Sequence, residues 1–246
     1  MNRPFEPPAA LAALPVRERV SSRARKLRIE IRPGGEIWLI IPQGISRARA
    51  YAFLAERADW ARRHATRLQT QIAAPMPLRF DGTDRIPLRG IDTPLRVLLA
   101  PALAVRVATD DIALAVPPQQ LADRTALERA LGRALRETAR ADTAAALSIE
   151  ASRLDIGYHG PRIADQRSRW GSCSAGGLIS LNWRLVMAPA EVLRYVVVHE
   201  LCHRRHHDHS PRFWRLVARQ MPGFESPRRW LRLHGTELSW ILPRPA

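Results

Sequence analysis

The sequence has few cysteines, no long apolar run and almost no lysine. Its 246 residues include only two cysteines, Cys173 and Cys202, so no disulfide framework is expected. No run of about 18 apolar residues occurs, so no membrane-spanning helix is predicted. The first residues carry an early glutamate and a proline pair, and their apolar centre is too short for a secretory signal. We therefore expect a flexible lead over residues 1–20 and a cytoplasmic protein without membrane contact.

The scarcity of lysine accompanies a large excess of arginine. Lys26 is the only lysine among 39 basic residues, and the formal net charge is +16. A genome rich in G and C produces this bias, because arginine codons then replace lysine codons. A surface that binds polyanions produces it too, since guanidinium groups engage phosphates with two hydrogen bonds. The two explanations are compatible, and the charge by itself indicates nothing about the fold.

The first half of the chain has the patterns of a β-rich subdomain. Apolar and polar residues alternate from Arg23 onward, Pro33-Gly34-Gly35 turns the chain, and an apolar run follows over 37–41. This order predicts a hairpin. Its outward face would carry a row of arginines, which is typical of solvated charge and also of a nucleic-acid surface. The row consists of Arg23, Arg25, Arg28 and Arg32.

One long helix and a second group of strands complete this predicted subdomain. Ser46 is a favourable N-cap for a helix to about Ile72, in which Phe53 and Trp60 would contact the core. Short apolar runs over 78–116 are separated by turn residues and predict a β-meander. A proline pair begins at Pro117 and is typical of a boundary. We therefore place the β-rich N-terminal subdomain at 21–117 and a second domain at 118–246.

The second half of the chain alternates helices with a hairpin. A helix is predicted over about 121–154, and a hairpin over 162–185 with Gly176-Gly177 at its turn. A further helix should begin near Pro189, because proline is favoured in the first turn. The 46% hydrophobic content is sufficient for one large or two modest cores. The expected fold class of the whole chain is α+β.

A His-Glu-x-x-His motif lies within this last helix. His199 and His203 are four residues apart, so they share one helix face and can present two imidazoles to one metal ion. Glu200 would then lie at the rim of the site, within reach of a metal-bound water. The alternative is a pair of exposed histidines at a helix end. The apolar run Val196–Val198 before the motif favours the metal site, as in a zinc hydrolase.

Hydrolytic zinc sites use three protein ligands and keep a position open for water, so a third ligand is required. Near the motif the sequence offers four candidates, and a fifth lies further along: His206, His207, Asp208, His209 and Glu225. If the helix continued, His206 would lie about 10.5 Å from His199, which is too far for both to bind one ion.

The residues after the motif favour His209 as that ligand. Ser210-Pro211 is typical of the start of a new helix, so the first helix should break near Asp208. His209 would then be free to fold onto the metal, at the spacing of the long metzincin motif but with His206 at its glycine position. Glu225 remains the alternative ligand, and Asp208 could instead orient an imidazole.

Four segments together resemble the YgjP-like metallopeptidases, which are relatives of the SprT-like zinc proteases. They are Arg169-Trp-Gly-Ser-Cys173, Leu181-Asn-Trp-Arg-Leu185, Tyr195-Val-Val-Val-His-Glu-Leu-Cys-His203 and His209-Ser-Pro-Arg-Phe-Trp214. The resemblance extends over about residues 20–236. It implies a zincin-like catalytic domain in which His199, His203 and His209 bind Zn²⁺ and Glu200 is the catalytic base.

The expected reaction is metal-assisted hydrolysis of a peptide bond. Zinc lowers the pKa of its bound water to about 7, and Glu200 takes the proton and later delivers it to the leaving group. A developing oxyanion needs a further donor, for which Tyr195 and Arg169 are candidates. Core packing or a structural ion pair would explain these two residues equally well. An extended peptide could bind along a strand edge of the second hairpin.

Three functions compete on this evidence. The first is a zinc peptidase whose protein or peptide substrates lie near nucleic acid, with contact through an arginine-rich surface. The second is a metal-dependent nucleoside triphosphate pyrophosphohydrolase, for which the sequence lacks a Gly-rich phosphate loop and a carboxylate cluster for magnesium. The third is a binding module with a structural metal, which would not need Glu200. The sequence specifies neither the cleaved bond nor an oligomeric state.

Overall fold

The computed structural model describes residues 8, 11, 14–31, 35–71, 77–166, 168–239 and 241–242. The chain divides into two compact units, Met1–Met76 and Pro77–Ala246, and each has its own hydrophobic core. We expected the boundary at Pro117, so this prediction differs from the structure. The strands between Pro77 and Pro117 belong to the second unit because their buried side chains join its core. Within the described residues, no helix is both long and apolar enough to cross a membrane.

The first unit contains a three-stranded sheet in the order β1-β3-β2. The predicted hairpin is confirmed, since β2 (Arg28–Ile31) pairs antiparallel with β3 (Ile37–Pro42). The flexible lead over 1–20 is wrong in part, because β1 (Val16–Ser21) pairs parallel with β3. A carboxylate fixes this charged strand to the following helix: Glu18 accepts hydrogen bonds from Tyr51 Oη and Arg47 Nε, both at 2.8 Å.

The predicted row of arginines lies on this unit and is exposed where the structure describes it. Arg23 and Arg25 precede β2, and Arg28 pairs with Glu30 at 3.6 Å on the same strand. Arg32 lies outside the described residues. Contact of this row with nucleic acid stays a prediction.

Two helices replace the one long helix expected in this part of the chain. Ser46 caps α1 (Arg47–Ala55) as predicted, accepting a hydrogen bond from Arg49 N, but the helix ends before α2 (Ala58–Gln71) begins. The break turns the next helix, so that small residues face the core: Ala58, Ala61 and Ala65. Phe53 packs against this core, whereas Trp60 is 40% exposed, and its predicted core contact is wrong. Ile72 lies outside the described residues.

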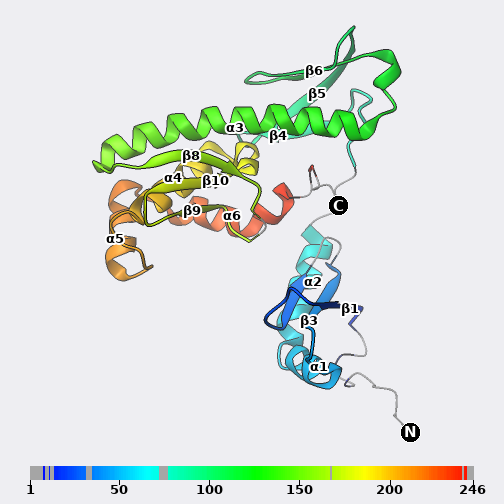
Figure 1. Ribbon diagram of the computed structural model, residues 1–246, viewed down its shortest axis with the longest axis vertical. Coiled ribbons are helices and arrows are strands. Elements are labelled where there is room, and N and C mark those ends of the chain that lie inside the picture. Colours follow the sequence, from blue (N-terminus) through cyan, green and yellow to red (C-terminus); the bar gives the residue numbers. More distant parts are fainter. Residues whose placement is uncertain are drawn as a thin grey trace. The chain divides into compact units, whose positions relative to one another are not determined.

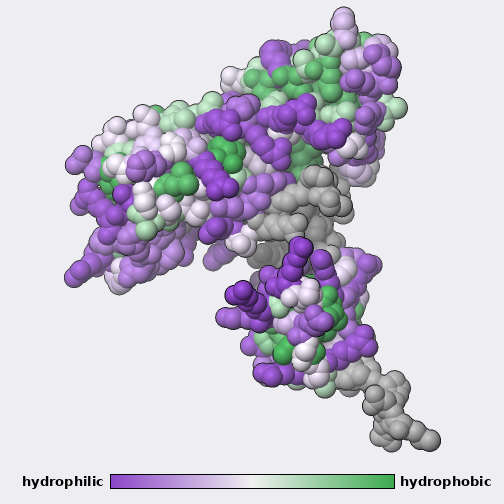
Figure 2. Space-filling view, in the orientation of Figure 1, coloured by the Kyte–Doolittle hydropathy of each residue, from purple (hydrophilic) through white to green (hydrophobic). Residues whose placement is uncertain are grey.

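The second unit begins with a four-stranded sheet that is not a meander. Its strands are β4 (Arg85–Leu88), β5 (Ile91–Leu99), β6 (Ala104–Val107) and β7 (Ile112–Val116), in the order β4-β5-β7-β6. β5 and β7 are parallel, because β6 turns back on the outer side of β7. Figure 2 shows hydrophobic residues gathered over this sheet, at the upper right of the view. Leu98 and Leu99 of β5 are exposed.

The long helix α3 (Arg124–Leu154) is the backbone of the second unit. A short 3₁₀ turn, η3 (Pro118–Gln120), precedes it, and Asp123 caps it by accepting a hydrogen bond from Ala126 N. In Figure 1, α3 runs between the four-stranded sheet and a second, three-stranded sheet. Its leucines are fully buried on the faces that meet these layers: Leu127, Leu131, Leu135 and Leu147. The helix thus unites the two sheets around one core.

The second predicted hairpin is confirmed, and it forms the central strand and one edge strand of the second sheet. β9 (Gly171–Cys173) pairs antiparallel with β10 (Leu178–Asn182), and β8 (His159–Ala164) pairs parallel with β10 on its other side. The order is β8-β10-β9, so β9 is an edge strand. Both faces of β10 are buried, which includes Ser180 and Asn182 on the side opposite Ile179 and Leu181.

Three helices follow the second sheet. A 3₁₀ segment, η4 (Trp183–Met187), leads into α4 (Ala190–Cys202), with Pro189 as its N-cap residue, and α5 (Pro211–Gln220) and α6 (Glu225–Leu238) complete the unit. We expected α4 to break near Asp208, but His203 is already its C-cap. The following arginines draw the chain away: Arg204 donates to carbonyls of Gly157 and Ala175, and Arg205 to those of Leu154 and Asp155.

A buried carboxylate ties α3, α4 and α5 together. Glu150 is 2% exposed and accepts hydrogen bonds from Arg194 Nε of α4 at 2.8 Å and Gln220 Nε2 of α5 at 2.9 Å. Arg153 adds an ion pair at 2.8 Å. Burial raises the pKa of Glu150, but these hydrogen bonds and charges outweigh it, so the pKa lies below its ordinary value. The network holds the helices that carry the site.

Candidate metal centre

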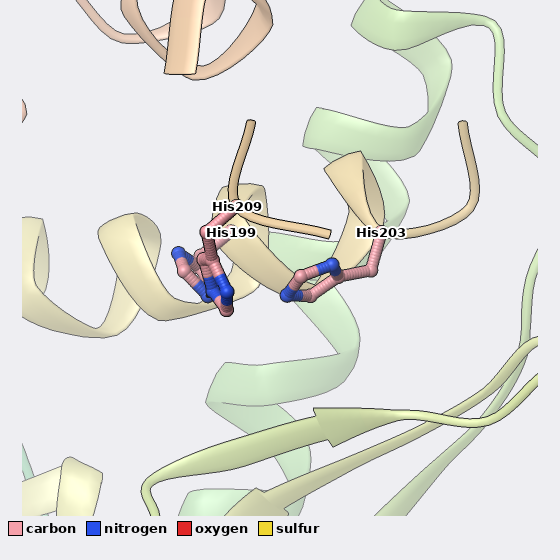
Figure 3. Close-up of side chains that lie close together, drawn as sticks. All are labelled: His199, His203 and His209. Atoms are coloured by element: carbon pink, nitrogen blue, oxygen red, sulfur yellow. The ribbon is translucent and has the colours of Figure 1, made fainter. Parts of the chain in front are cut away.

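Three imidazoles from α4 and the segment after it converge on one point. His199 lies in the last turn of α4, His203 caps the helix, and His209 returns just before α5. The candidate ligand nitrogens all lie within 4.8 Å of one another, and Nε2 of His199 is 3.1 Å from Nε2 of His209. Figure 3 shows the three rings pointing toward each other. The structure therefore brings together the three residues that we predicted as ligands.

An aromatic wall formed by α5 holds these rings in place. The Phe213 ring centroid lies 4.6–5.0 Å from those of His199, His203 and His209. Trp214 lies 5.7 Å from the rings of His199 and His209. Because α5 starts at Pro211, both aromatic residues lie in its first turn, beside the cluster.

The surroundings of His199 and His203 favour the neutral imidazole, which is the form that binds a metal. Burial, helped by the neighbouring His203 and His209 and by Arg228, lowers the pKa of His199 to about 3. Nδ1 of His203 lies 3.0 Å from the backbone carbonyl oxygen of His206, to which it can donate. This bond leaves Nε2 of His203 unprotonated, so that its lone pair faces the cluster.

The donor set and its spacing fit a transition-metal ion bound through imidazole. Two ligands at about 2.0–2.1 Å from a tetrahedral zinc lie roughly 3.3 Å apart, close to the 3.1 Å between the two Nε2 atoms. Uncharged imidazole nitrogens suit zinc and its neighbours in the first transition row and do not suit magnesium or calcium. In addition, the buried Nδ1 atom of His199 has no hydrogen-bond partner among the described residues, so the chain itself does not satisfy every polar atom of the cluster.

The other candidates for the third ligand lie outside the cluster. Glu225 begins α6, is exposed and does not belong to the group of converging ligands. His206 lines a different cavity, although His207 borders the same one as the cluster. Asp208 accepts a hydrogen bond from Ser210 N at 3.4 Å, and the His206 carbonyl takes the orienting role that we considered for it.

Glu200 lies beside the three histidines in a cavity of about 470 Å³. Its side chain points into a site that leaves the residue only 6% exposed. Burial raises the pKa of this carboxyl to about 7, while the charge of Arg169 opposes the shift. A carboxyl with this pKa can both take up and release a proton near neutral pH.

Gly171 on the edge strand β9 makes room for that carboxyl. A Cβ atom added at Gly171 would lie 2.5 Å from Glu200 Oε1 and 2.7 Å from its Cγ, well inside van der Waals contact. Any larger residue would therefore push Glu200 out of its position. The role of this glycine in the Arg169–Cys173 segment was not part of the sequence prediction, because it depends on a contact between β9 and α4.

The two predicted oxyanion donors both line the cavity. Tyr195 is buried, and its ring stacks on Phe224 at 6.3 Å and lies 5.8 Å from the ring of His199. Burial raises the pKa of its phenol, so Tyr195 keeps its proton and can act as a donor. Arg169 is exposed at the rim, and its charge is felt by Glu200.

A second arginine near the cavity was missed in the sequence. Arg228 of α6 lies over the Trp214 ring, with its guanidinium carbon 4.3 Å from the ring centroid. Its charge opposes the rise in the pKa of Tyr195 and adds to the fall in the pKa of His199. In a chain with so many arginines, nothing in the local pattern distinguishes Arg228 from its neighbours; only the return of α6 onto α4 does so.

The two cysteines differ in their surroundings. Cys202 is fully buried, and burial raises the pKa of its thiol to about 12. Cys173 is half-buried at the end of β9 and lines the metal cavity, where burial raises its pKa to a smaller extent. Both are free thiols, as predicted.

A comparison with protein families agrees with the motif. The family described as the YgjP-like metallopeptidase domain matches residues 25–234. Among solved structures, the metallopeptidase zymogen abylysin of Pyrococcus abyssi is similar, at 24% identity over 37% of this chain and 95% of that chain, with a TM-score of 0.34. No curated protein matches. The family match covers most of the sequence, both the strands and helices before the motif and the metal centre itself, and the chain belongs to the YgjP-like metallopeptidase family.

Proposed function

We propose that the protein is a cytoplasmic, zinc-dependent peptidase with a zincin-like catalytic unit over Pro77–Ala246, and that its substrates are proteins held near nucleic acid. One observation carries this proposal: Glu200 shares a cavity with three converging imidazoles. A purely structural metal site has no use for a buried carboxyl beside its ligands. The N-terminal unit, with its own core and sheet, would precede the catalytic unit as a separate subdomain.

His199, His203 and His209 would hold the metal through their imidazole nitrogens. A bound zinc ion supplies a polarised carbonyl and a water that ionises near pH 7. The chain supplies the proton transfer: the Glu200 carboxylate takes a proton from the attacking water and returns it to the leaving amine. Its burial between β9 and α4 favours this role, because a pKa of about 7 matches both steps.

Negative charge on the substrate carbonyl oxygen would be met by donors from three elements. Tyr195 offers a protonated phenol from α4, and Arg228 offers a fixed positive charge from α6. Arg169 lies on the β9 side of the cavity, where its positive charge also favours the carboxylate form of Glu200. Donors fixed before the substrate arrives stabilise an oxyanion without reorganising, which is the main source of such catalysis.

The edge strand β9 offers a place for an extended peptide. Gly171, Ser172 and Cys173 line the cavity, and β9 pairs with β10 on one side only. A peptide that pairs with the free side of β9 would run past Glu200 and the three imidazoles. Main-chain hydrogen bonds along this edge would bind substrates of varied sequence, as expected for a peptidase that acts on unfolded segments.

The test compares zinc-loaded wild-type protein with its Glu200→Gln variant, which keeps the shape of the side chain and the three imidazoles. Cleavage of an unfolded protein should fall at least 100-fold in the variant, while the zinc content stays the same. Glu191→Gln, at an exposed position in the first turn of the same helix, is the matched control and should cleave normally. Absence of cleavage in every protein would contradict the proposal.

A parallel measurement addresses the competing phosphohydrolase function. The same proteins are given nucleoside triphosphates, and release of pyrophosphate is followed. Under the proposed function, no release above the zinc-free background is expected. Release that depends on Glu200, without cleavage of protein, would assign the site to phosphorus chemistry instead.

A further inference from the structure

A second cavity lies beside the metal centre and is lined almost entirely by cations. Its volume is about 510 Å³, and its lining residues come from the turn after α4 and from α5: Arg205, His206, Arg212, Arg215, Leu216 and Arg219. None of the described residues that line it carries a carboxylate. Figure 2 shows hydrophilic residues gathered over α5, at the lower left of the view. Four guanidinium groups around one hollow require an anionic partner if their mutual repulsion is to be offset.

These arginines differ from the arginines of the second unit that form ion pairs. Within the described part of the chain, none of the four forms an ion pair, whereas Arg89 pairs with Asp142 and Arg194 pairs with Glu150. Arg205 is held by the backbone carbonyls of Leu154 and Asp155. The side chains of the three arginines on α5 have no hydrogen-bond partner among the described residues. A genomic preference for arginine explains their number but not this grouping without carboxylates.

The geometry of α5 arranges the three cations in a row. Arg212, Arg215 and Arg219 follow the i, i+3, i+7 spacing that places residues on one helix face. The row extends about 10.5 Å along the helix axis. Leu216 is buried at the floor of the cavity between them. Phe213 and Val217 lie on another side of α5 and join the core, so the helix is fixed by one side while it presents arginines on the other.

We propose that the arginine row of α5 binds the phosphate backbone of a nucleic-acid strand. A strand presents evenly spaced negative charges, about one per 3.4 Å of a DNA helix axis, so the row can meet more than one phosphate at a time. Guanidinium groups match phosphate oxygens with paired hydrogen bonds. Among the described residues, no Phe, Tyr or Trp side chain lines the cavity, and arginines form most of its lining, so we expect it to contact the phosphate backbone and not to read the base sequence.

This site gives the proposed peptidase a specific means of acting near nucleic acid. The segment from His203 to Ser210 carries metal ligands toward one cavity and Arg205 and His206 toward the other. A strand bound on α5 would therefore lie next to the catalytic cavity and place proteins on that strand within reach. Only this delivery of proteins to the catalytic cavity rests on the proposed function. Binding of the strand itself requires neither the metal nor Glu200.

The experiment measures the fluorescence anisotropy of a labelled 20-nucleotide single-stranded DNA with the full-length protein at several salt concentrations. The variant Arg212→Gln/Arg215→Gln/Arg219→Gln should bind at least 10-fold more weakly at 0.1 M salt. The slope of log K against log salt should fall in magnitude by about 2, since each lost phosphate contact on a single strand contributes about 0.7. The Lys triple variant at the same positions should keep binding within a few-fold, because it keeps the charge.

A matched control removes the same charge from another exposed helix. Arg129, Arg133 and Arg140 are exposed on α3, and their triple change to Gln should leave the DNA affinity within twofold of wild type. A melting curve confirms that each variant is folded. Equal loss in both triple variants would show that only total charge matters and would overturn the assignment to α5.

Two competitors identify the ligand class. Polyglutamate of equal total charge should displace the DNA poorly; equally good displacement would assign the surface to acidic proteins and overturn the proposal. A nucleoside triphosphate at equal phosphate concentration should also compete weakly, because it cannot span the row. Unchanged cleavage of an unfolded protein by the α5 triple variant separates this result from the proposed function: DNA binding can fail while peptidase activity remains, and the reverse holds for Glu200→Gln.

Discussion

Two cavities border the segment between α4 and α5, and their charged groups differ in burial. The metal cavity contains the three histidines and Glu200, and the arginine cavity is lined by Arg205, Arg212, Arg215 and Arg219. In the metal cavity, burial keeps His199 neutral and brings the pKa of Glu200 to about 7, so that protons and a metal can be exchanged. In the arginine cavity, by contrast, the four guanidinium groups are exposed to solvent. Burial turns ionisable groups into reactive ones, whereas exposure leaves them as fixed charges suited to binding. One short segment of chain therefore serves both purposes because its two sides differ in access to water.

The largest effect is expected from removing a ligand of the metal cavity alone. The variant His209→Ala should lower zinc affinity more than 100-fold and abolish cleavage, because even residues that only orient a ligand contribute 10–100-fold. Its affinity for single-stranded DNA should stay within twofold of wild type. Zinc content after dialysis and DNA anisotropy measure the two effects. Glu225→Ala is the control and should keep its zinc; the opposite pattern would make Glu225 the third ligand.

The next largest effect is expected from breaking the Glu150 network, which links the helices α4 and α5 that border both cavities. Glu150→Ala leaves the Arg194 guanidinium in a partly buried position without its carboxylate, and should lower the free energy of unfolding by about 3–5 kcal/mol. Both zinc affinity and DNA affinity should then fall, because α4 and α5 lose their common anchor. Chemical denaturation is the measurement, and Glu137→Ala, in an exposed pair with Arg140, is the control with little expected change.

The pKa of Glu150 also sets how the free energy of unfolding depends on pH. The pKa of Glu150 is lowered in the folded protein, so its stabilisation is complete above the ordinary glutamate pKa of about 4.3 and is lost as the pH falls below it. Wild type should therefore lose more stability than Glu150→Ala between about pH 5 and the acid limit. Parallel losses in the two proteins would show that Glu150 carries no such stabilisation.

A smaller effect is expected from moving the catalytic carboxyl without removing it. Gly171→Ala adds a methyl group 2.5 Å from Glu200 Oε1, so the carboxyl must shift. Because a displacement of about 1 Å can cost 100-fold in rate, kcat/KM for an unfolded protein should fall by about that factor. Gly176→Ala, in the turn of the same hairpin with its nearest neighbouring atom at 4.0 Å, should retain activity. DNA binding should be unchanged in both.

The smallest effect is expected at Arg228, and it distinguishes an arginine that supports catalysis from the arginines of α5 that bind DNA. Arg228→Gln should lower kcat/KM about 10-fold, because it removes a positive charge near the substrate carbonyl, but should leave DNA affinity unchanged. Arg229→Gln, at the adjacent exposed position, is the control for both measurements. Reduced DNA binding in the Arg228 variant with normal catalysis would assign this residue to the nucleic-acid surface and not to catalysis.

The candidate ligands could be predicted because their arrangement is local. Two histidines four residues apart on a helix define a shared face, and the Ser210-Pro211 pair signals a helix start that turns His209 back. Gly171 and Arg228 could not be found in this way. Their roles depend on contacts of β9 and α6 with α4, and such contacts leave no periodic signal in the sequence.

The fold shows the same division between local and distant interactions. Both predicted hairpins form, because strand pattern and turn residues lie close together in the chain. The parallel pairing of β5 with β7 was missed, since alternation identifies a strand but not its neighbour. Trp60 was misplaced because a break of two residues between α1 and α2 rotates the helical face. The net charge of +16 likewise did not predict that Arg212, Arg215 and Arg219 gather on α5.

The unequal surroundings of the two cysteines have a practical consequence. Cys202 has no exposed surface and a thiol pKa of about 12, so thiol reagents cannot compete for it in the folded protein. Cys173 is the only other cysteine in the chain and borders the metal cavity. The wild-type protein therefore already contains a single position for attaching a fluorophore or spin label, at the end of the edge strand proposed to receive substrate. Peptide docking can be followed there spectroscopically without first engineering a cysteine-free background.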